Sequence, residues 1–377
     1  MHDESPMKHL ACVVGARPNF MKMAPILRAL RSQPDIRPVL IHTGQHYDAA
    51  LSDVFFEELD MPRPDVSLEV GSGSHGKQTA LILERMEQTL VDGPPDGGNY
   101  DHLVVVGDVN STVASALAAA KLGIPVAHVE AGLRSWDRSM PEEINRIVTD
   151  SISDMLFVSE PAGVENLKRE GHGDDEIHLV GNVMIDTLHF LLPRAQDRPI
   201  LTEMELEPRS YGFVTLHRPS NVDDARTLGR LLDALVEIAA QVPLVFPMHP
   251  RTQARVEEFN LGTKLDQRSG LIVTPPLGYL DCLCLTSQAR LIITDSGGLQ
   301  EESTALEVPC VTMRENTERP ITVTAGTSTL AGNSADVLAE SVTRILTGTY
   351  KRATCPSLWD GHAAERTVEA LSARLLK

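Results

Sequence analysis

The sequence predicts an α/β protein with two doubly wound parallel sheets, which form two domains facing each other across a cleft. Short, wholly apolar runs that suit buried strands alternate with segments of helical periodicity. The length of 377 residues exceeds what a single core usually fills. The alternation pauses in the polar segment 193–209 and restarts at Tyr211. We therefore expect a first domain over residues 1–182, a second over 183–361, and a last amphipathic helix over 362–377 that packs back on the first domain.

One β-α-β unit carries the most informative residues of the first domain. An apolar strand over 103–106 precedes Asp108, a helix of small residues follows over about 111–122, and a second apolar strand over 126–129 ends at Glu130. In open parallel sheets, ligands bind in the crevice outside the carboxyl ends of the strands. Both acids are therefore expected to face one crevice.

A further pair of acids, Glu142 and Glu143, opens the next helix directly behind Pro141. A carboxylate in the first turn of a helix interacts favourably with the helix dipole, and proline suits the first helical position. Three carboxylates that converge on one crevice indicate proton-transfer chemistry. The alternative is that all three acids only cap helix starts.

The first strand, over 10–14, runs into a polar turn and a helix expected over 20–31. Arg17 and Lys22 lie at this turn, over the same crevice as Asp108. Proline inside a helical pattern kinks the helix or marks its true first turn, and Pro25 is expected to do one or the other.

The second domain repeats this arrangement with residues that suit a phosphate. His217 and Arg218 follow the strand 212–216, where Arg17 stands in the first domain. Ser296-Gly297-Gly298 follows a buried strand and precedes a helix, so backbone N–H groups and the helix dipole can bind an anion there. Glu302, one helical turn further on, can accept hydrogen bonds from a ribose. The alternative is a glycine-rich turn satisfied by water.

Composition excludes several classes of function. The formal net charge of −18 makes the chain a poor general binder of nucleic acid or of an anionic membrane surface. The sequence shows no apolar window long enough for a membrane span and no signal-peptide pattern at its start. The five cysteines lack metal-binding spacing, so we expect no metal, reduced thiols and a cytoplasmic location. Neither half has a G-x-G-x-x-G after its first strand, neither has a P-loop motif, and we expect no cofactor.

Eight stretches together resemble one family. They are GARPNFMKMAPILRAL, TGQHYD, GDVNST, HVEAGLRS, PEEINR, HRPSNVD, DSGGLQEE and MRENTERP. In sequence and in order, these stretches resemble the motifs of the bacterial non-hydrolysing UDP-N-acetylglucosamine 2-epimerases. Together they extend over nearly the whole chain. The resemblance implies two Rossmann-like domains as in GT-B glycosyltransferases, a homodimer, and inversion at C2 of UDP-GlcNAc to give UDP-ManNAc without NAD or metal.

The resemblance also implies a reaction route and roles for residues. UDP leaves as C2 loses its proton, which gives 2-acetamidoglucal, and UDP then adds back as C2 is reprotonated on the other face. The catalytic roles fall on Asp108, Glu130, Glu142 and His217. Substrate-binding roles fall on Arg17, Lys22, Arg218, Tyr279, Ser296, Gly297, Gly298, Glu302 and Arg319, with Tyr279 in a loop near the uracil. A possible activator site includes Gln45 and His46.

Two motifs depart from the family pattern. The first turn has ARPNF where many members have TRPEA, and the His-Arg motif has HRPSN where many have HRREN. Relatives with such motifs include epimerases of UDP-2,3-diacetamido uronic acids, so this substrate remains an alternative. A hydrolysing epimerase that releases ManNAc and UDP is another. A UDP-sugar glycosyltransferase and a catalytically silent UDP-sugar sensor fit the three acids less well.

Overall fold

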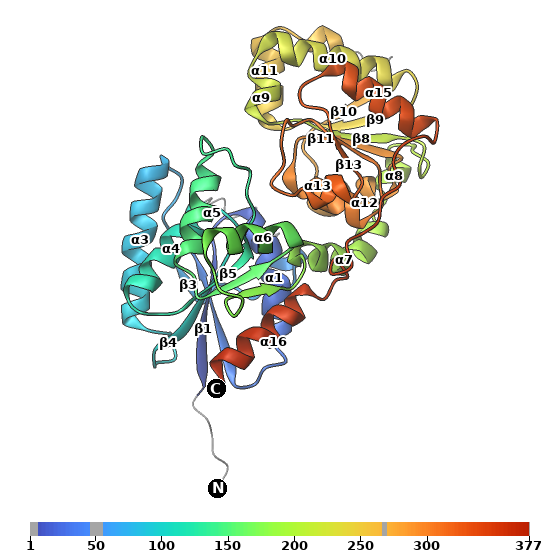
Figure 1. Cartoon of the computed structure of the whole chain (residues 1–377). Coiled ribbons are helices and arrows are strands. Elements are labelled where there is room, and N and C mark those ends of the chain that lie inside the picture. The colour runs from blue at the N-terminus through green and yellow to red at the C-terminus, as the bar shows by residue number, and fades with distance from the viewer. Residues whose placement is uncertain (1–6, 46–55, 266–269, 377) are drawn as a thin grey trace. The chain divides into compact units, whose positions relative to one another are not determined.

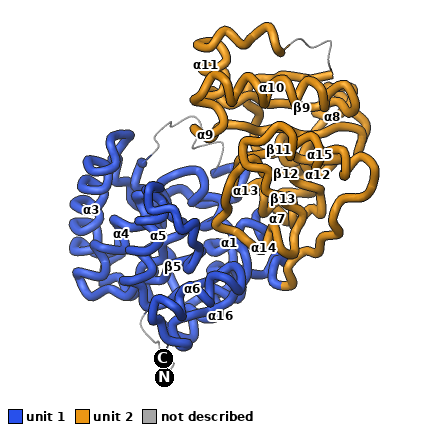
Figure 2. Tube along the Cα trace, turned by 45° about the horizontal axis from the view of Figure 1, so that its top comes forward, with its two compact units in different colours: residues 1–187, 358–377 blue, residues 188–357 orange. Residues whose placement is uncertain are grey.

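A computed structural model describes residues 7–45, 56–265 and 270–376, and the chain in it forms two compact units. Unit 1 comprises residues 1–187 and 358–377, and unit 2 comprises residues 188–357 (Figure 2). The C-terminal helix α16 (Ala363–Leu375) belongs to unit 1, where it packs beside α1 (Arg17–Leu30) (Figure 1). Each unit contains its own sheet, and the predicted fold class is confirmed.

Unit 1 contains a parallel sheet that has seven strands within the described ranges, in the order β3-β2-β1-β4-β5-β6-β7. This is the order of a Rossmann-like domain, in which the chain reverses direction across the sheet between β1 and β4. The strands are β1 (Lys8–Val14), β2 (Ile36–His42), β3 (Val66–Ser67), β4 (Tyr100–Val106), β5 (Val126–Ala131), β6 (Met155–Val158) and β7 (Ile177–Leu179). The further helices are α3 (His75–Asp92), α4 (Asn110–Lys121), α5 (Pro141–Ser151), α6 (Pro161–Glu170) and α7 (Val183–Gln196), the last of which continues into unit 2.

Unit 2 repeats the topology, with the order β10-β9-β8-β11-β12-β13 and a reversal between β8 and β11. Its strands are β8 (Gly212–Thr215), β9 (Leu244–Pro247), β10 (Leu271–Thr274), β11 (Leu291–Thr294), β12 (Cys310–Thr312) and β13 (Ser328–Leu330). Its helices are α8 (Ile200–Glu203), α9 (Pro219–Val222), α10 (Ala225–Ala239), α11 (Pro250–Glu258), α12 (Tyr279–Gln288), α13 (Gly297–Ala305), α14 (Ile321–Thr324) and α15 (Ala335–Leu346), with a 3₁₀ turn at Gly262–Leu265.

Central strands such as β4 and β9 are mostly apolar because side chains on both faces of the sheet are buried there. In β4, the residues from Leu103 to Val106 are all buried. In unit 2, α10 packs its apolar face against the sheet and contributes Leu228, Leu232 and Leu235 to the core. Such burial on both faces is typical of parallel sheets covered by helices. Across the described ranges, no helix combines the length and the apolar character needed to cross a membrane.

Helix α1 begins at Arg17, three residues before the predicted start, and Pro25 lies inside it. Proline has no N–H, so the carbonyl of Met21 loses its usual partner within the helix. The hydroxyl of Thr187 donates to that carbonyl at 2.6 Å. A residue of α7 therefore compensates for the proline, and the helix continues through it.

Candidate functional site

Asp108 lies just beyond β4, at the point where the sheet of unit 1 reverses direction. Nη1 of Arg146, in α5, lies 2.5 Å from Asp108 Oδ2. The side-chain amide of Asn145 donates to the Asp108 carbonyl at 2.9 Å. Arg146 is buried, whereas the Asp108 side chain is 29% exposed. The carboxylate is thus held on one side by a buried cation and remains open to solvent on another.

Glu130 occupies an irregular position near the end of β5. Its φ of +74° is unusual for a residue with a side chain, and the pairing of β5 with β6 shifts register around it. Its carboxylate forms a buried ion pair with the ammonium of Lys22, in α1. A Cβ placed on Gly107 would lie 2.8 Å from Lys22 Nζ and 3.4 Å from Glu130 Oε2. The backbone next to Asp108 therefore approaches this ion pair closely, and the structure brings Lys22, Asp108 and Glu130 together.

The two acids at the start of α5 differ in their surroundings. Glu143 is buried, and its carboxylate accepts hydrogen bonds from the backbone N–H groups of Ser135 and Trp136 at 3.0 and 2.8 Å. Arg146 Nη2 lies 2.5 Å from the same carboxylate. Burial raises the pKa of Glu143, but these hydrogen bonds and the Arg146 charge outweigh burial and hold the pKa below its ordinary value. Glu142 is half-buried and lies in the first turn, on the helix that supplies the contacts to Asp108.

A single side chain holds the turn after β1. Asn19 Oδ1 accepts hydrogen bonds from the N–H groups of Gly15 and Ala16 at 3.2 and 3.1 Å. Its Nδ2 donates to the carbonyl of Val106 at 2.8 Å, which ties the turn to the end of β4. Arg17 is exposed at the first position of α1, directly after this turn, and its role in substrate binding stays a prediction.

Gln45 has a structural contact that its predicted role did not include. Its Oε1 accepts from the backbone N–H and the hydroxyl of Ser111 at 3.1 and 2.6 Å, at the start of α4. Its backbone carbonyl accepts from Gln78 at 3.1 Å. Activator binding by Gln45 stays a prediction, and His46 lies outside the described residues.

In unit 2, His217 and Asp295 form a dyad at the equivalent reversal point. Asp295 is fully buried, and its Oδ1 lies 2.7 Å from His217 Nδ1. The same carboxylate accepts from the N–H groups of His217 and Arg218 at 2.9 and 2.8 Å, and from the amide of Asn221 at 3.0 Å. Burial raises the pKa of Asp295, but these donors and the His217 charge bring it below its ordinary value. The imidazole of His217 is thus oriented through Nδ1, which leaves Nε2 available for chemistry.

The helix α13 begins at Gly297, directly after Ser296, and its first turn lies against charged residues. A Cβ placed on Gly297 would lie 3.1 Å from Glu318 Oε1 and 3.3 Å from Arg319 Nη1. Arg319 is buried and pairs with Glu318 at 2.6 Å and with Glu301 at 2.5 Å. A helix N-terminus beside a guanidinium suits an anionic group.

Tyr279 and Glu302, which were predicted from separate motifs, are also brought together. The Tyr279 hydroxyl donates to Glu302 Oε1 at 2.9 Å. Tyr279 is the first residue of α12 and so lies in a helix, which corrects the expectation of a loop position. Around Gly298, a Cβ would meet no atom within 4 Å, in contrast to Gly297.

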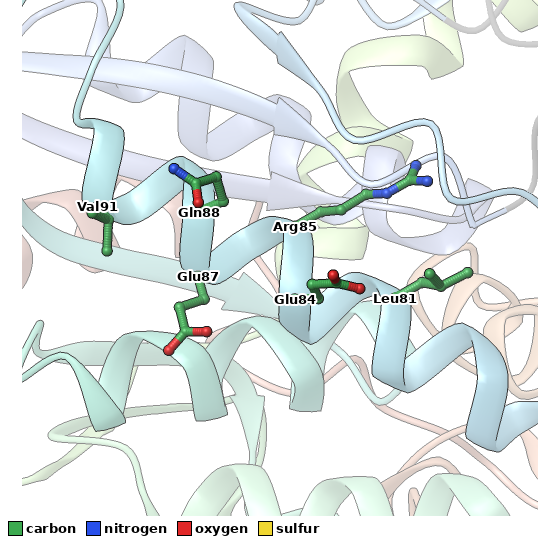
Figure 3. A pocket seen from close by; sticks show the side chains of 6 residues that line it. All are labelled: Leu81, Glu84, Arg85, Glu87, Gln88 and Val91. Atoms are coloured by element: carbon green, nitrogen blue, oxygen red, sulfur yellow. The ribbon is translucent and has the colours of Figure 1, made fainter.

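A surface hollow of about 520 Å³ lies elsewhere, along one face of α3 (Figure 3). Its lining residues are Leu81, Glu84, Arg85, Glu87, Gln88 and Val91, and none of the predicted site residues is among them. Within the described ranges, no group of three or more His, Cys, Asp or Glu side chains could hold a metal ion.

Three residues of the site were missed from the sequence. Asp295 directly follows a buried strand, as Asp108 nearly does, so the strand-end rule that identified Asp108 could have identified it. Arg146 lies three residues after Glu143, a spacing that places the two on one helix face. Asn19 carries no comparable signal, because its role depends on the distant carbonyl of Val106.

Comparisons with known proteins identify relatives of the chain. A family model described as UDP-N-acetylglucosamine 2-epimerase matches residues 28–372. The UDP-N-acetylglucosamine 2-epimerase of Methanocaldococcus jannaschii is 42% identical over 369 residues, which cover 96% of this chain and 98% of that protein. The UDP-2,3-diacetamido-2,3-dideoxy-D-glucuronate 2-epimerase of Pseudomonas aeruginosa is 41% identical over 334 residues, which cover 87% of this chain and 90% of that protein.

The solved structures show the same relationship. The M. jannaschii UDP-GlcNAc 2-epimerase in complex with UDP-GlcNAc and UDP matches with a TM-score of 0.85 at 40% identity, over 97% of this chain and 99% of that one. The Neisseria meningitidis UDP-GlcNAc 2-epimerase bound to UDP-GlcNAc matches with a TM-score of 0.84 at 28% identity, over 97% of this chain and 100% of that one. The chain therefore belongs to the UDP-N-acetylglucosamine 2-epimerase family.

Proposed function

We propose that this protein interconverts UDP-GlcNAc and UDP-ManNAc by eliminating UDP and adding it back. The observation that carries the proposal is the pair Asp108 and Glu130, two carboxylates at the ends of adjacent strands of one sheet, of which Asp108 pairs with the Arg146 guanidinium and Glu130 with the Lys22 ammonium. The M. jannaschii relative and its complex with UDP-GlcNAc support the choice of substrate.

The chemistry explains why several acids are needed. The C2 hydrogen of UDP-GlcNAc is not next to a carbonyl, so direct deprotonation is too difficult. In the proposed route, the C1–O bond breaks, UDP takes the electron pair, and a carboxylate takes the C2 proton, which gives 2-acetamidoglucal. UDP then adds to C1 while a second acid protonates C2 on the opposite face. Asp108, Glu130 and Glu142 supply this acid and base chemistry.

Unit 2 supplies groups that suit the diphosphate. His217 is oriented by Asp295, and the N-terminus of α13 lies beside the guanidinium of Arg319. Hydrogen-bond donors and cations stabilise the charge that develops on departing UDP. Arg17, Arg218, Ser296, Gly297 and Gly298 complete the proposed diphosphate contacts. Tyr279 and Glu302 are proposed to contact the uridine.

Proton NMR of the purified protein with UDP-GlcNAc in D₂O tests this function. UDP-ManNAc carrying deuterium at C2 is expected, because the proton taken by a carboxylate exchanges with solvent before it returns. Free ManNAc together with UDP would instead indicate a hydrolysing epimerase. An unchanged spectrum would contradict the proposed substrate.

A second candidate substrate is a UDP-2,3-diacetamido uronic acid. The P. aeruginosa enzyme named for this substrate is as similar to the chain as the archaeal UDP-GlcNAc epimerases, at 41% identity. The ratio of kcat/KM for the two UDP-sugars decides between them. A ratio that favours the uronic acid would change the substrate and leave the reaction type intact.

The protein is also proposed to act as a homodimer in the cytoplasm. The family resemblance supports the dimer, and the five free cysteines suit a reducing compartment. Sedimentation equilibrium tests the first expectation, and a single species of 41 kDa would contradict it. Fractionation of the native cells tests the second.

A further inference from the structure

A buried histidine with two acceptors lies behind the acids of unit 1. His128, in β5, is completely buried. Its Nδ1 lies 2.6 Å from Asp150 Oδ1, and its Nε2 lies 2.9 Å from the carbonyl oxygen of Gly107. A carbonyl oxygen and an ionised carboxylate can only accept hydrogen bonds. Both ring nitrogens must therefore carry a proton if both bonds are made, and the ring is then an imidazolium.

The surroundings of Asp150 favour this distribution of protons. Asp150 is completely buried, and its Oδ2 accepts from the N–H of Gly132 at 3.0 Å and lies 2.7 Å from Arg134 Nη2. Burial raises the pKa of Asp150, but the charges and hydrogen bonds of His128 and Arg134 outweigh burial and leave it below its ordinary value. The N–H of Gly132 and the guanidinium of Arg134 favour the ionised form of Asp150, so its Oδ1 is placed to accept from His128 Nδ1.

The charges of this cluster balance, which makes a buried imidazolium tenable. Arg134 lies 2.5 Å from Glu170 Oε2, and its Nε donates to the other oxygen at 2.9 Å. The cluster therefore contains two cations, His128 and Arg134, and two anions, Asp150 and Glu170. A buried charge is costly unless it is paired and its hydrogen bonds are satisfied, and both conditions hold here.

The cluster contacts the backbone on both sides of the candidate acids. The His128 ring holds the carbonyl of Gly107, the residue before Asp108, and Asp150 holds the N–H of Gly132, two residues after Glu130. The two glycines have φ of +70° and +79°, which glycine adopts readily, but Glu130 between them has φ of +74°, which is unusual for a residue with a side chain. Such a conformation persists only where the surrounding structure enforces it. The hydrogen bonds from the cluster to Gly107 and Gly132 hold the backbone on either side from inside the sheet.

We propose that His128 is a positioning residue that donates from both ring nitrogens and acts with Asp150 to hold the Asp108 and Glu130 carboxylates in place for proton transfer. This inference rests on the proposed function for the identity of the reaction, and His128 and Asp150 act only through the backbone of the two loops. Displacing a reacting group by about 1 Å can cost about 100-fold in rate. The variants should therefore lose kcat while binding of the UDP-sugar, and with it KM, changes little.

The first experiment uses nitrogen NMR of the whole protein labelled with ¹⁵N in its histidines. Signals that disappear in His128→Gln are assigned to His128. We expect two protonated ring nitrogens, because each of them faces a hydrogen-bond acceptor. One protonated and one bare nitrogen would overturn the proposal. This measurement holds whatever the enzyme's substrate, so it stands even where the proposed function fails.

The second experiment measures kcat and KM for UDP-GlcNAc in His128→Gln and Asp150→Asn. Each is expected to lower kcat by about 10- to 100-fold and to change KM by less than about threefold. The double variant should be little worse than either single variant, because both act through one network. Deuterium incorporation at C2 should slow in parallel. Equal kcat in the variants and the wild type would overturn the positioning role.

The control is His102→Asn. His102 is a buried histidine of the neighbouring strand β4, at the end of the strand away from Asp108, and burial lowers its pKa. This variant should lose stability and keep kcat within about twofold of the wild type, since surface and core changes away from a site act mainly on folding. If kcat of His102→Asn fell as far as kcat of His128→Gln, the His128 effect would be explained by general destabilisation of the sheet, and the positioning role would be refuted. A wild type without epimerase activity on either UDP-sugar would refute the proposed function only.

Discussion

Replacing Gly107 by alanine tests whether the Lys22–Glu130 ion pair matters for the reaction. A matched control lies in the same β-α-β unit, because Gly107 and Gly123 have almost the same φ, +70° and +72°. Alanine in this left-handed region costs about 1 kcal/mol of stability at either position. A Cβ on Gly123 would meet no atom within 4 Å, so Gly123→Ala should show this backbone cost alone.

Gly107→Ala should cost more, because its Cβ would lie 2.8 Å from Lys22 Nζ. Real Cβ contacts are not this short, so the Lys22 ammonium must move away from residue 107, and we expect this shift to disturb its pair with Glu130. The side chains of Lys22 and Glu130 are 7% and 6% exposed, and breaking such a buried ion pair by removing one partner costs about 3–5 kcal/mol. Because the ion pair is displaced and not removed, the loss in free energy of unfolding for Gly107→Ala should lie between the backbone cost and the cost of breaking the pair, at about 2–4 kcal/mol. We expect kcat to fall by about 100-fold, since a reacting carboxylate is displaced.

Urea unfolding followed by circular dichroism measures the stability of both variants, and initial rates of UDP-ManNAc formation give their kcat. The informative quantities are the differences between the two variants in free energy of unfolding and in kcat, because the backbone cost is common to both. Equal unfolding midpoints together with equal kcat values would refute the claim that the backbone beside Asp108 constrains the ion pair. A loss of kcat in Gly123→Ala as well would show that any strain in this unit impairs the enzyme.

Three further predictions concern other parts of the chain. Asp295→Asn should lower kcat by about 10³-fold, because an amide beside Nδ1 favours the wrong tautomer of His217, while UDP affinity measured by calorimetry changes little. Gly297→Ala should weaken UDP binding and Gly298→Ala should not, because only the first Cβ would contact the charged pair beside α13; equal affinities would contradict this. Burial raises the pKa of Asp186, which caps α16, to about 6. The pKa of Asp186 is higher in the folded than in the unfolded chain, so ionising this carboxyl destabilises the fold. The free energy of unfolding of the wild type, relative to that of Asp186→Asn, should therefore fall by about 3 kcal/mol as the pH rises from about 4 to above 6. A difference in urea midpoints that does not change with pH would refute this prediction.

The strands were predictable from sequence where burial on both faces makes them apolar. The run from Leu103 to Val106 is of this kind, and β4 covers it. β3 and β13 were not predicted because each is very short and contains polar residues, as in Val66–Ser67 and Ser328–Leu330. The strand order depends on pairing between distant segments, so a one-dimensional pattern does not contain it.

The candidate site was predictable as far as the strand-end rule applies. Asp108 follows β4, and His217 follows β8, each at a point where the sheet reverses direction. The positive φ of Glu130 was not predictable, because it depends on the shifted register between β5 and β6. The role of His128 required the positions of two acceptors far from it in the chain, on Asp150 and Gly107.

The adjacent acids Glu142 and Glu143 show how packing divides two roles that the sequence leaves equivalent. Both stand in the first turn of α5, so the helix dipole favours a carboxylate at either position. Arg146 follows Glu142 by four residues and Glu143 by three, so both acids lie on the helix face of Arg146, and the Arg146 guanidinium pairs with Glu143. Its carboxylate accepts two backbone N–H groups and the Arg146 guanidinium, so protonation would cost several charge-assisted hydrogen bonds. Glu143 is therefore suited to fixing the loop at Trp136 and the cation that holds Asp108, and this leaves Glu142 as the acid of the pair that we propose to exchange a proton with the substrate.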